Sequence, residues 1–574
     1  MKRTSLAVLM IALALVALVA PMAYAQAPAP KVTINGLIDN VTSYSQNISN
    51  YNGGLFNRKD SMWYYRTRGR FDIIGEVGKA KGVLGIELDH TYGQTGSNDS
   101  SIAISGPQAG ATSVATQPGT DGGFDLNTDS RGIIEIKWLY VEFPVPLIPV
   151  PTTARLGAQP FGAAANYKLA VYANGDFPGV NVVSQVTPNV KIVGTYVQIQ
   201  ESLVGIQSKR NQTGPLGYGG TGAQGGVASF FSRADVQNRG DDFAVIGSLE
   251  ITPFKGLDIK PMYSLFYAQG GTDGNARQGR GGLVAGGSNA VTGNAFNNAD
   301  GTFRGGVNEY RHTVGVDGRL RMGPFSFDPT VLYQFGNRAV VVPSAFAGVI
   351  TNRTAGSKAH ANLDAWLVDL REGFQLGPLL IEALQVYSTG NKARNSTLGT
   401  VRYFQPLDTD TSYLADWGTQ VTSLGVDYIN TWNSAGARMA YPGAAIGWDK
   451  YGRGQLGLKA TYAITPALSI MAGANGHWTA EGMDRDGTAV AGGGIMPNFA
   501  GPKVRGTSHF VGTEYTTLLS WRFADGLVWD NAFGYLMAGK ALDAVTANLF
   551  PAAPGYHRSA LDTYILSSRV RFTF

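Results

Sequence analysis

The sequence predicts an all-β fold: a transmembrane antiparallel β-barrel of about 18 strands, with short periplasmic turns and long extracellular loops. Polar and apolar residues alternate at every second position in many separate segments, and the connections between these segments are alternately short and long. Only 15% of the residues are charged, while 44% are apolar. Soluble proteins of this length carry more charge, whereas half of each barrel strand faces lipid, where charge is costly.

The N-terminus has the pattern of an export signal. Two basic residues precede an uncharged apolar stretch from Leu6 to Ala20, and Ala23-Tyr24-Ala25 places small residues at a cleavage site. We therefore expect residues 1–25 to be a signal peptide and residues 26–574 to form the mature barrel. The alternative is an uncleaved anchor helix, which the short apolar stretch disfavours.

Composition excludes several kinds of chemistry. Cysteine is absent, so the chain has no disulfide, thiol nucleophile or cysteine-ligated metal. The net charge is +5, and loss of Lys2 and Arg3 with the signal would leave +3. This small excess favours neither nucleic acid nor a strongly anionic partner. After Ala25 there is no apolar run long enough for a membrane helix.

Residues 309–322 show the strand pattern most clearly. One face carries Glu309, Arg311, Thr313, Asp317, Arg319 and Arg321. The other face carries Tyr310, His312, Val314, Val316, Leu320 and Met322. Successive side chains of a strand point to opposite sides, so this segment has a polar face and a mostly apolar face. A helix would mix the two sets around its circumference.

The connections divide into two kinds. Short turns rich in Gly, Pro, Asn and Asp occur at 79–82, 187–189, 253–256, 323–324, 377–378, 465–467 and 524–526, with a longer proline-rich turn at 144–151. Long polar stretches occupy 93–130, 201–240, 270–307, 337–362, 390–450, 480–507 and 539–560. The expected strands are 32–45, 62–78, 82–92, 131–143, 153–160, 180–187, 190–200, 241–252, 257–268, 308–322, 325–336, 363–374, 379–389, 451–464, 468–479, 508–523, 527–538 and 561–574.

A secreted solenoid or a set of soluble sandwiches would also show alternation. Neither fold requires short and long connections in strict alternation. Neither requires bulky aromatic residues on the exposed face near the strand ends, where we place Trp138, Trp478, Trp521, Trp529 and Tyr535. The barrel is therefore the preferred interpretation.

The C-terminus resembles that of Gram-negative outer-membrane porins. The chain ends in Phe574, preceded at alternate positions by aromatic or apolar residues such as Phe572 and Val570. The resemblance implies that Phe574 is a signal for the barrel-assembly machinery and that the protein resides in the outer membrane, among its lipid and lipopolysaccharide. The alternative is simply a last amphipathic strand. Porins of the solute-diffusion class are often trimers, whereas several 18-strand relatives are monomers; the resemblance favours a homotrimer, with a monomer as the alternative.

The segment Leu156–Gly162 is similar to the porin strand that leads into a loop folded inside the barrel. The resemblance implies an inner, pore-constricting loop at 161–180, which contains Tyr167, Lys168 and Asp176. This loop is less acidic than that of the general porins, which leaves the selectivity open. The alternative is an ordinary surface loop.

Charged residues with one parity identify candidate pore-lining positions. Such residues are costly on a lipid-facing surface, so we expect them to point into the barrel. They are Arg66, Arg68, Arg70, Asp72, Glu87, Asp89, Arg319, Arg321 and Arg371. One hypothesis is a weakly anion-preferring pore with Arg66, Arg68 and Arg70 near its narrow part, facing the inner loop. The alternative is that these arginines pair with nearby carboxylates and only hold the wall.

Several functions remain open at this point. The main prediction is a porin-type channel for passive diffusion of ions and small hydrophilic solutes. A substrate-specific barrel, a polysaccharide-export barrel and a closed structural or adhesive barrel are the alternatives. We expect no enzyme activity, cofactor or metal centre, because the six histidines are scattered without metal-ligand spacing. Asp408-Thr409-Asp410 and residues 297–301 could bind Ca²⁺ in outer loops, although such residues are more often solvated turns.

Overall fold

A computed structural model shows the chain as a closed antiparallel β-barrel whose wall has 18 strands. It describes residues 29–47, 61–92, 133–161, 172–200, 242–269, 308–341, 358–390, 400–405, 407–409, 417–422, 426, 452–482, 487–489, 495–497, 508–542, 544–546 and 556–574. The proposed signal peptide, Tyr167, Lys168 and residues 297–301 lie outside this range. Within it, no helix is long and apolar enough to span a membrane.

Every strand expected from the sequence is present in the wall. The wall strands are β1 (Lys31–Gln46), β2 (Ser61–Val77), β3 (Ala80–Tyr92), β4 (Ile133–Pro144), β5 (Thr152–Phe161), β6 (Ala173–Thr187), β7 (Val190–Gln200), β8 (Asp242–Phe254), β9 (Leu257–Gln269), β10 (Asn308–Met322), β11 (Phe325–Val341), β12 (Lys358–Leu376), β13 (Leu379–Ser388), β16 (Arg453–Thr465), β17 (Leu468–Trp478), β20 (Phe510–Ala524), β21 (Leu527–Ala538) and β24 (Thr563–Thr573). The predicted count of 18 strands is confirmed. The predicted start of the sixth strand is wrong: residues 173–179, which the sequence assigned to the inner loop, belong to β6, and β6 pairs with β5 from Gly175 onward.

The shorter elements lie inside the wall or beyond its ends. They are β14 (Thr400–Val401), β15 (Asp408–Thr409), β18 (Gly487–Ala489), β19 (Ile495–Pro497), the 3₁₀ turn η5 (Lys540–Leu542), β22 (Ala544–Thr546) and β23 (Tyr556–Arg558). β18 pairs with β19 and β22 pairs with β23. β14 and β15 instead pair in parallel with the wall strands β12 and β6.

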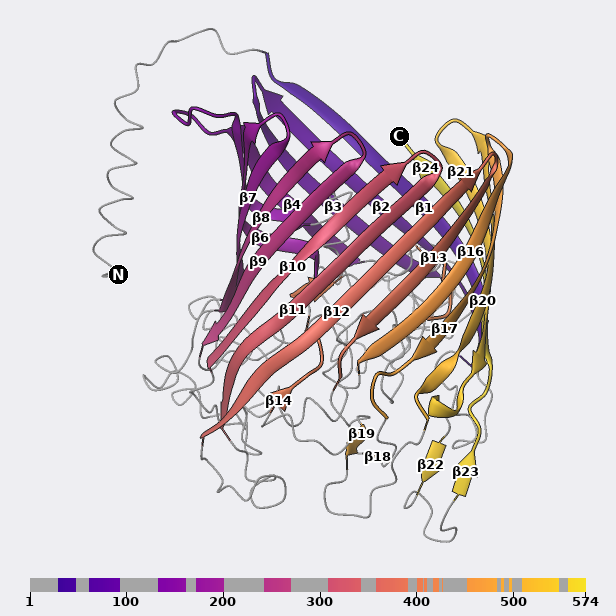
Figure 1. Ribbon diagram of the computed structural model, residues 1–574. Helices are drawn as coiled ribbons and strands as arrows, with labels where there is room; N and C mark the ends of the chain where they lie inside the picture. Colours follow the sequence, from indigo (N-terminus) through magenta and orange to yellow (C-terminus); the bar gives the residue numbers. More distant parts are fainter. Residues whose placement is uncertain are drawn as a thin grey trace, which may run out of the picture.

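The barrel closes between its first and last strands. β1 pairs antiparallel with β24 on one side and with β2 on the other. Backbone hydrogen bonds of 3.0 Å join Gly36 and Phe574 in both directions, just beyond the end of β24. Closure leaves no free sheet edge, which a barrel in lipid requires because unpaired backbone groups are costly there. The long tilted strands form one continuous wall in Figure 1.

The two ends of the barrel differ as the sequence predicts. At one end, which we call the short-turn end, neighbouring strands are joined by the residues 78–79, 188–189, 255–256, 323–324, 377–378, 466–467 and 525–526. The β4–β5 connection at this end is longer and spans residues 145–151. The C-terminus also lies at this end (Figure 1). The long connections emerge at the opposite end, which we call the loop end.

The outer surface of the wall is apolar and the inner surface is polar. On β2, Trp63 and Tyr65 are 78% and 43% exposed and face outward. Arg66, the next residue on the same strand, faces inward and is fully buried. Leu456 and Leu458 on β16 are more than half exposed, while Gln455 is buried on the inner side. This distribution is the reverse of a soluble protein and is that of a transmembrane β-barrel.

One predicted orientation is wrong. The alternation around residue 138 places Trp138 on the outer face, but the β3–β4 register shifts between Gly85 and Ile86. This bulge puts Trp138 opposite Gly85, on the inner face, while Ile136 is 66% exposed outside. A bulge adds one residue to a strand and therefore reverses the parity beyond it.

Candidate functional site in the barrel interior

The inner wall carries ion pairs on strands all around the barrel. Their bonded atoms are 2.7 Å apart in Glu142–Arg155, 2.9 Å in Glu250–Lys260, 2.6 Å in Asp258–Arg319, 3.1 Å in Glu382–Lys459, 2.6 Å in Asp530–Arg569 and 2.8 Å in Asp39–Arg571. Arg321 pairs in the same way with Asp328. Most of these side chains are partly exposed. Charges that retain contact with solvent inside a closed wall indicate a hydrated interior, because dry burial of charge is costly.

Arginines are concentrated where the barrel closes. In register across the wall, Arg571 of β24 lies opposite Asp39 of β1, which in turn lies opposite Arg68 of β2. Arg66 and Arg569 occupy the next inward row, on either side of Val41. Arg66 is fully buried, so it cannot contact a solute directly.

Glu87 is the centre of the cluster on β2 to β4. Its carboxylate lies 3.3 Å from Arg68 Nη2 and 3.7 Å from Lys137 Nζ, and it is also bonded by Arg70. The Glu87 side chain is only 7% exposed, whereas that of Arg70 is 37% exposed. The cationic groups therefore lie between the carboxylate and the lumen.

Asp176 connects the candidate inner loop to this cluster. Its carboxylate lies 2.9 Å from Lys137 Nζ and accepts a 2.6 Å hydrogen bond from Trp138 Nε1. Asp176 belongs to β6, but Lys137 and Trp138 lie on β4 beyond the last β4–β5 pair. The loop-side end of β6 therefore leans toward the interior of the barrel, beside the arginines of β2.

The remaining candidate residues lie at several places on the wall. Asp72 faces inward on β2, opposite Gly85. The backbone of Asp89 pairs with Arg68, but its side chain lies outside the described residues. Arg319, Arg321 and Arg371 lie on β10 and β12, where they pair with Asp258, Asp328 and Asp369. These three arginines are thus separate from the cluster on β2.

A second feature of the interior is a segment that we call the inner strap, comprising residues 400–405, 407–409, 417–422 and 426. The sequence assigned it to a long outer loop, and this assignment is wrong for the described residues. Asp408 in β15 pairs with Ala173 of β6, and the Leu407 amide donates a 2.8 Å hydrogen bond to the Tyr172 carbonyl. The strap therefore runs beside the first residues of β6, Ala173 and Asn174, inside the wall.

Apolar contacts hold the strap against one side of the wall. The buried cluster contains Tyr172, Ala173, Phe177, Val197, Ala244, Ile246, Met262, Phe266, Leu332, Ala365, Leu367, Leu384, Val386, Phe404, Leu407 and Trp417. The wall members come from β6 to β9 and from β11 to β13, Tyr172 directly precedes β6, and Phe404, Leu407 and Trp417 come from the strap. The Tyr172 hydroxyl completes the contact with a 2.7 Å bond to Ser264 Oγ. This part of the interior is a packed core.

Buried polar contacts fix the strap at Gln405. Its amide donates to Gln334 Oε1 at 2.8 Å, and its carbonyl accepts from Gln334 Nε2 at 2.6 Å. Its side-chain oxygen accepts from Arg311 Nη1 at 3.1 Å. The Arg311 guanidinium also lies 4.3 Å from the Phe266 ring centre and 3.3 Å from the Glu309 carboxylate.

Glu514 fixes the far end of the strap. Its Oε1 accepts hydrogen bonds from the Gln420 and Val421 amides, at 2.5 and 2.8 Å. Its Oε2 accepts from the Thr422 amide at 3.0 Å and from the Thr422 hydroxyl at 2.5 Å. Glu514 is fully buried on β20. The strap therefore reaches from the β10–β12 side to the β20 side, and the arginines of β24 and β2 lie on the part of the wall beyond β21.

Sequence reasoning missed several residues of the interior. Arg569 and Arg571 share the inward parity of the last strand, so the alternation could have identified them. Trp138 was hidden by the bulge, whereas Lys137 lies on the inner face, opposite in parity to the outward-facing Ile136. The strap residues carry no periodic signal, because they follow an irregular path. Among the described residues, no group of three or more His, Cys, Asp or Glu side chains is arranged to hold a metal ion.

Comparison with known proteins identifies similar barrels but no family. No family model and no curated protein matches the chain. Among solved structures, Pseudomonas aeruginosa OccK8 (OprE) aligns over 95% of this chain and 98% of its own, with 10% identity and a TM-score of 0.41. P. aeruginosa OpdQ aligns over 95% and 97%, with 9% identity and a TM-score of 0.41. Acinetobacter baumannii OccAB3 aligns over 94% and 99%, with 9% identity and a TM-score of 0.38. Similarity at this level assigns neither a substrate nor a family to this chain.

Proposed function

We propose that the protein is a channel for passive diffusion of ions and small hydrophilic solutes across the outer membrane. The observation that carries this proposal is the set of partly exposed ion pairs on the inner wall. A barrel with an apolar exterior and a charged, solvated interior supplies a polar path through hydrocarbon. The channel needs no cofactor, because diffusion through such a path needs no chemistry.

The location follows from the same distribution of residues. An apolar outer surface on a closed barrel requires lipid, and the export signal and the terminal Phe574 support assembly in the outer membrane. Folded protein in the outer-membrane fraction should migrate faster on SDS gels before boiling than after it. A band unaffected by heating, found in a soluble fraction, would contradict this location. We also propose lipopolysaccharide as a neighbour and a trimer as the assembly, which native mass spectrometry tests.

The exposure of the ion pairs supports a weak preference for anions. In the Arg571–Asp39 pair the arginine side chain is 35% exposed and the aspartate 4%. In the Arg70–Glu87 pair the values are 37% and 7%. In these two pairs, which lie near the closure of the barrel, the arginine is the more exposed partner, whereas in Glu250–Lys260 and Glu382–Lys459 the carboxylate is the more exposed partner. Rows of exposed charge of one sign bias which ions pass.

Planar-bilayer recordings test both parts of the proposal. The purified protein should give stable conductance steps, and its reversal potential in a salt gradient should show anion preference. The double variant Arg70→Ala, Arg571→Ala should shift the reversal potential toward cation preference. Lys79→Ala, in a turn at the short-turn end, is the control for removal of a positive charge outside the lumen. Unchanged selectivity in the double variant would refute the assigned role of these arginines.

The second candidate function is a closed structural barrel. The packed core around Phe404, Leu407 and Trp417 favours it, because the inner strap fills part of the interior. The same recordings separate the two functions. A folded, heat-modifiable barrel that gives no conductance would support the closed barrel and end the channel proposal. A substrate-specific or polysaccharide-export channel would instead conduct, and its current would be blocked by the solute it binds.

A further inference from the structure

The β4–β5 turn differs from the other turns at the short-turn end. The others have only two residues between strands, whereas this one spans residues 145–151 and follows Pro144. The sequence from 144 to 151 is Pro-Val-Pro-Leu-Ile-Pro-Val-Pro, which contains no charged or hydrogen-bonding side chain. Figure 1 shows this purple segment projecting sideways from the barrel rim. A turn that is longer than the others, projects from the rim and has only apolar side chains needs a physical explanation.

Leu147 at the tip of this turn is unfavourable both in conformation and in exposure. Its φ is 66°, a left-handed conformation that leucine rarely adopts. Its side chain is 80% exposed, and the neighbouring Ile148 is 43% exposed. Left-handed non-glycine residues are unfavourable and persist where the surroundings or function impose them. An exposed leucine gains no packing energy in return, so folding alone does not account for it.

The turn is held firmly in place. The Val145 amide donates a 2.8 Å hydrogen bond to the Thr152 carbonyl at the neck of the turn. The Gln185 amide of β6 donates a 2.8 Å bond to the Pro151 carbonyl. Prolines restrict the backbone between these points. Leu147 and Ile148 are therefore presented on a rigid support at the rim.

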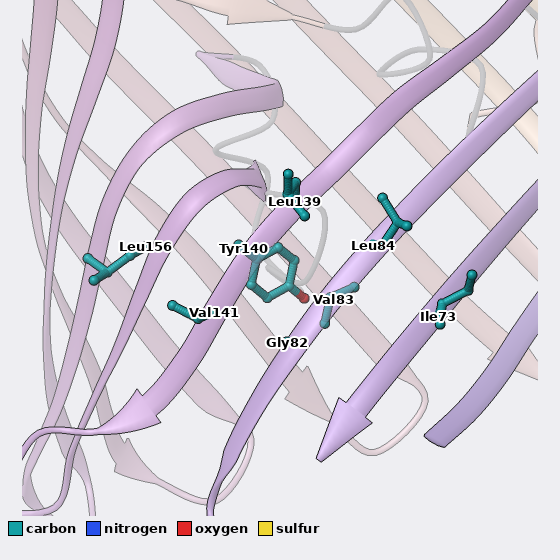
Figure 2. A pocket seen from close by; sticks show the side chains of 8 residues that line it. All are labelled: Ile73, Gly82, Val83, Leu84, Leu139, Tyr140, Val141 and Leu156. Atoms are coloured by element: carbon teal, nitrogen blue, oxygen red, sulfur yellow. The ribbon is translucent and has the colours of Figure 1, made fainter. Parts of the chain in front are cut away.

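An apolar groove lies on the outer wall next to this turn. Its floor is Gly82, which pairs with Gly75, and an added Cβ at either glycine would meet no atom within 4 Å. The side chains around it include Ile73, Leu84, Leu139, Val141 and Leu156 (Figure 2). The groove has a volume of about 320 Å³. Glycine within a strand often marks a place where a ligand approaches the backbone closely.

The groove and the turn form one continuous surface. Val141 lies just before the turn on β4, and Leu156 lies just after it on β5. Both face outward, on the wall that faces hydrocarbon in a membrane barrel. The surface thus extends from the lipid-facing band of the wall to the boundary at its rim, without a charged residue in the turn.

We propose that this surface binds a phospholipid of the periplasmic leaflet. One acyl chain occupies the groove over Gly82, and Leu147 and Ile148 insert at the boundary between headgroups and acyl chains. Apolar side chains inserted at this depth anchor proteins in proportion to the apolar area that they bury. The proposal rests on the membrane location given above, and lipid is favoured over a protein partner because the turn offers no polar or charged side chain for pairing.

Site-specific labelling tests the contact directly. The natural chain has no cysteine, so Leu147→Cys gives a single site for an environment-sensitive fluorophore. The labelled protein is reconstituted in phosphatidylcholine vesicles that contain phospholipids brominated on their acyl chains. Leu458→Cys on the outer wall is the lipid-facing control, and Lys79→Cys in a short turn at the same end is the water-facing control. The label at 147 should be quenched at least about twofold more than the label at 79.

The controls distinguish failure of this proposal from failure of the membrane location. If the label at 458 is quenched but that at 147 is not, the turn is not an anchor, although the barrel is in the membrane. If neither is quenched, the membrane location itself fails. If the label at 147 is shielded only when trimers form, the surface contacts a second copy and the lipid proposal is wrong.

Filling the groove gives an independent test. Gly82→Leu places a side chain in open space, so the barrel should still fold. Native mass spectrometry of the protein released from vesicles should then show less bound phospholipid than in the unsubstituted protein. Leu147→Gly removes the unfavourable left-handed leucine, so this variant should fold at least as well as the unsubstituted protein. In a protein that also carries Ile148→Cys with the fluorophore attached, Leu147→Gly should reduce the quenching of that label. Unchanged lipid binding in Gly82→Leu, together with unchanged quenching in the Leu147→Gly protein, would overturn the proposal.

Discussion

At the scale of single residues, charged side chains of the inner wall occupy two different environments, one exposed and one fully buried. Arg70 and Arg571 are each more exposed than their carboxylate partners, Glu87 and Asp39. Glu514 is fully buried and accepts hydrogen bonds from three consecutive strap amides and one hydroxyl. Hydrogen bonds to a charged acceptor are stronger than those between neutral groups. Glu514 therefore acts as a structural anchor for the inner strap, and Arg70 and Arg571 are suited to contact solutes.

Replacing Glu514 should loosen the strap without disrupting the wall. In Glu514→Gln, one oxygen becomes an NH₂ group, which cannot accept the bonds from the Thr422 amide and hydroxyl. Leaving these buried groups without an acceptor costs about 1–3 kcal/mol. Amide hydrogen exchange in residues 417–422 should become roughly tenfold faster, as measured by mass spectrometry.

The control for this variant is Glu142→Gln. Glu142 also contributes an inward carboxylate, but it pairs with Arg155 on the wall and is 21% exposed. Exchange in the strap should not change in this protein. Equal protection of residues 417–422 in both variants would show that Glu514 does not hold the strap.

Alternation predicts the face of a residue where parity is uninterrupted. Arg66, Arg68 and Arg70 lie on the inner face of β2, as the cost of charge in lipid requires, and their role as pore-lining residues stays a prediction. Parity failed at Trp138 because the bulge beside Gly85 adds a residue to one strand. Bulges are local backbone features without a definite sequence signature, so alternation alone could not place Trp138.

At the scale of elements, strands were predictable and the path of the strap was not. Each wall strand has one face toward lipid and one toward the interior, so apolar and polar residues alternate along its sequence. The strap is anchored by scattered contacts at Gln405, Trp417 and Thr422, which lie far from their partners in sequence. In the sequence, its partners, such as Gln334 and Glu514, show the same pattern as any other inward-facing residue, so nothing marks them as contacts of the strap.

Substitution of the final residue, Phe574, distinguishes an assembly signal from a purely structural contact. The Phe574 ring lies over Gly36 and 6.3 Å from the Phe71 ring centre, and its backbone pairs with Gly36. Phe574→Ala keeps the backbone bonds and loses only ring contacts, which are worth about 0.5–1.5 kcal/mol. Refolding into detergent should therefore be little affected. If Phe574 is an assembly signal, the amount of folded protein in the outer membrane of cells should fall strongly.

Phe572→Ala provides the matched control, because Phe572 is also aromatic, faces outward and is 40% exposed. The ratio of cellular to in vitro folded yield should fall much more for Phe574→Ala than for Phe572→Ala. Equal ratios would mean that the terminal ring has only a structural role.

At the scale of the whole molecule, the barrel has two independent sources of order. The wall is a continuous cycle of backbone hydrogen bonds, closed between β1 and β24. The interior is divided between the packed side with Phe404 and Leu407 and the wall that carries Arg70 and Arg571. Since the wall hydrogen bonds do not involve most of the strap, the wall should survive its removal, and the open cross-section should increase.

Replacing residues 391–451 by a short Gly-Ser linker tests this division. The strand ends at Ser388 and Arg453 are neighbours in the wall, so a short linker can join them. The shortened protein should remain heat-modifiable on SDS gels, because all strand pairs of the wall are retained. Its single-channel conductance should be larger than that of the full chain, since the strap no longer occupies the lumen. A folded barrel with unchanged conductance would show that the strap does not limit the pore, whereas failure to fold would show that the core around Trp417 is required to form the wall.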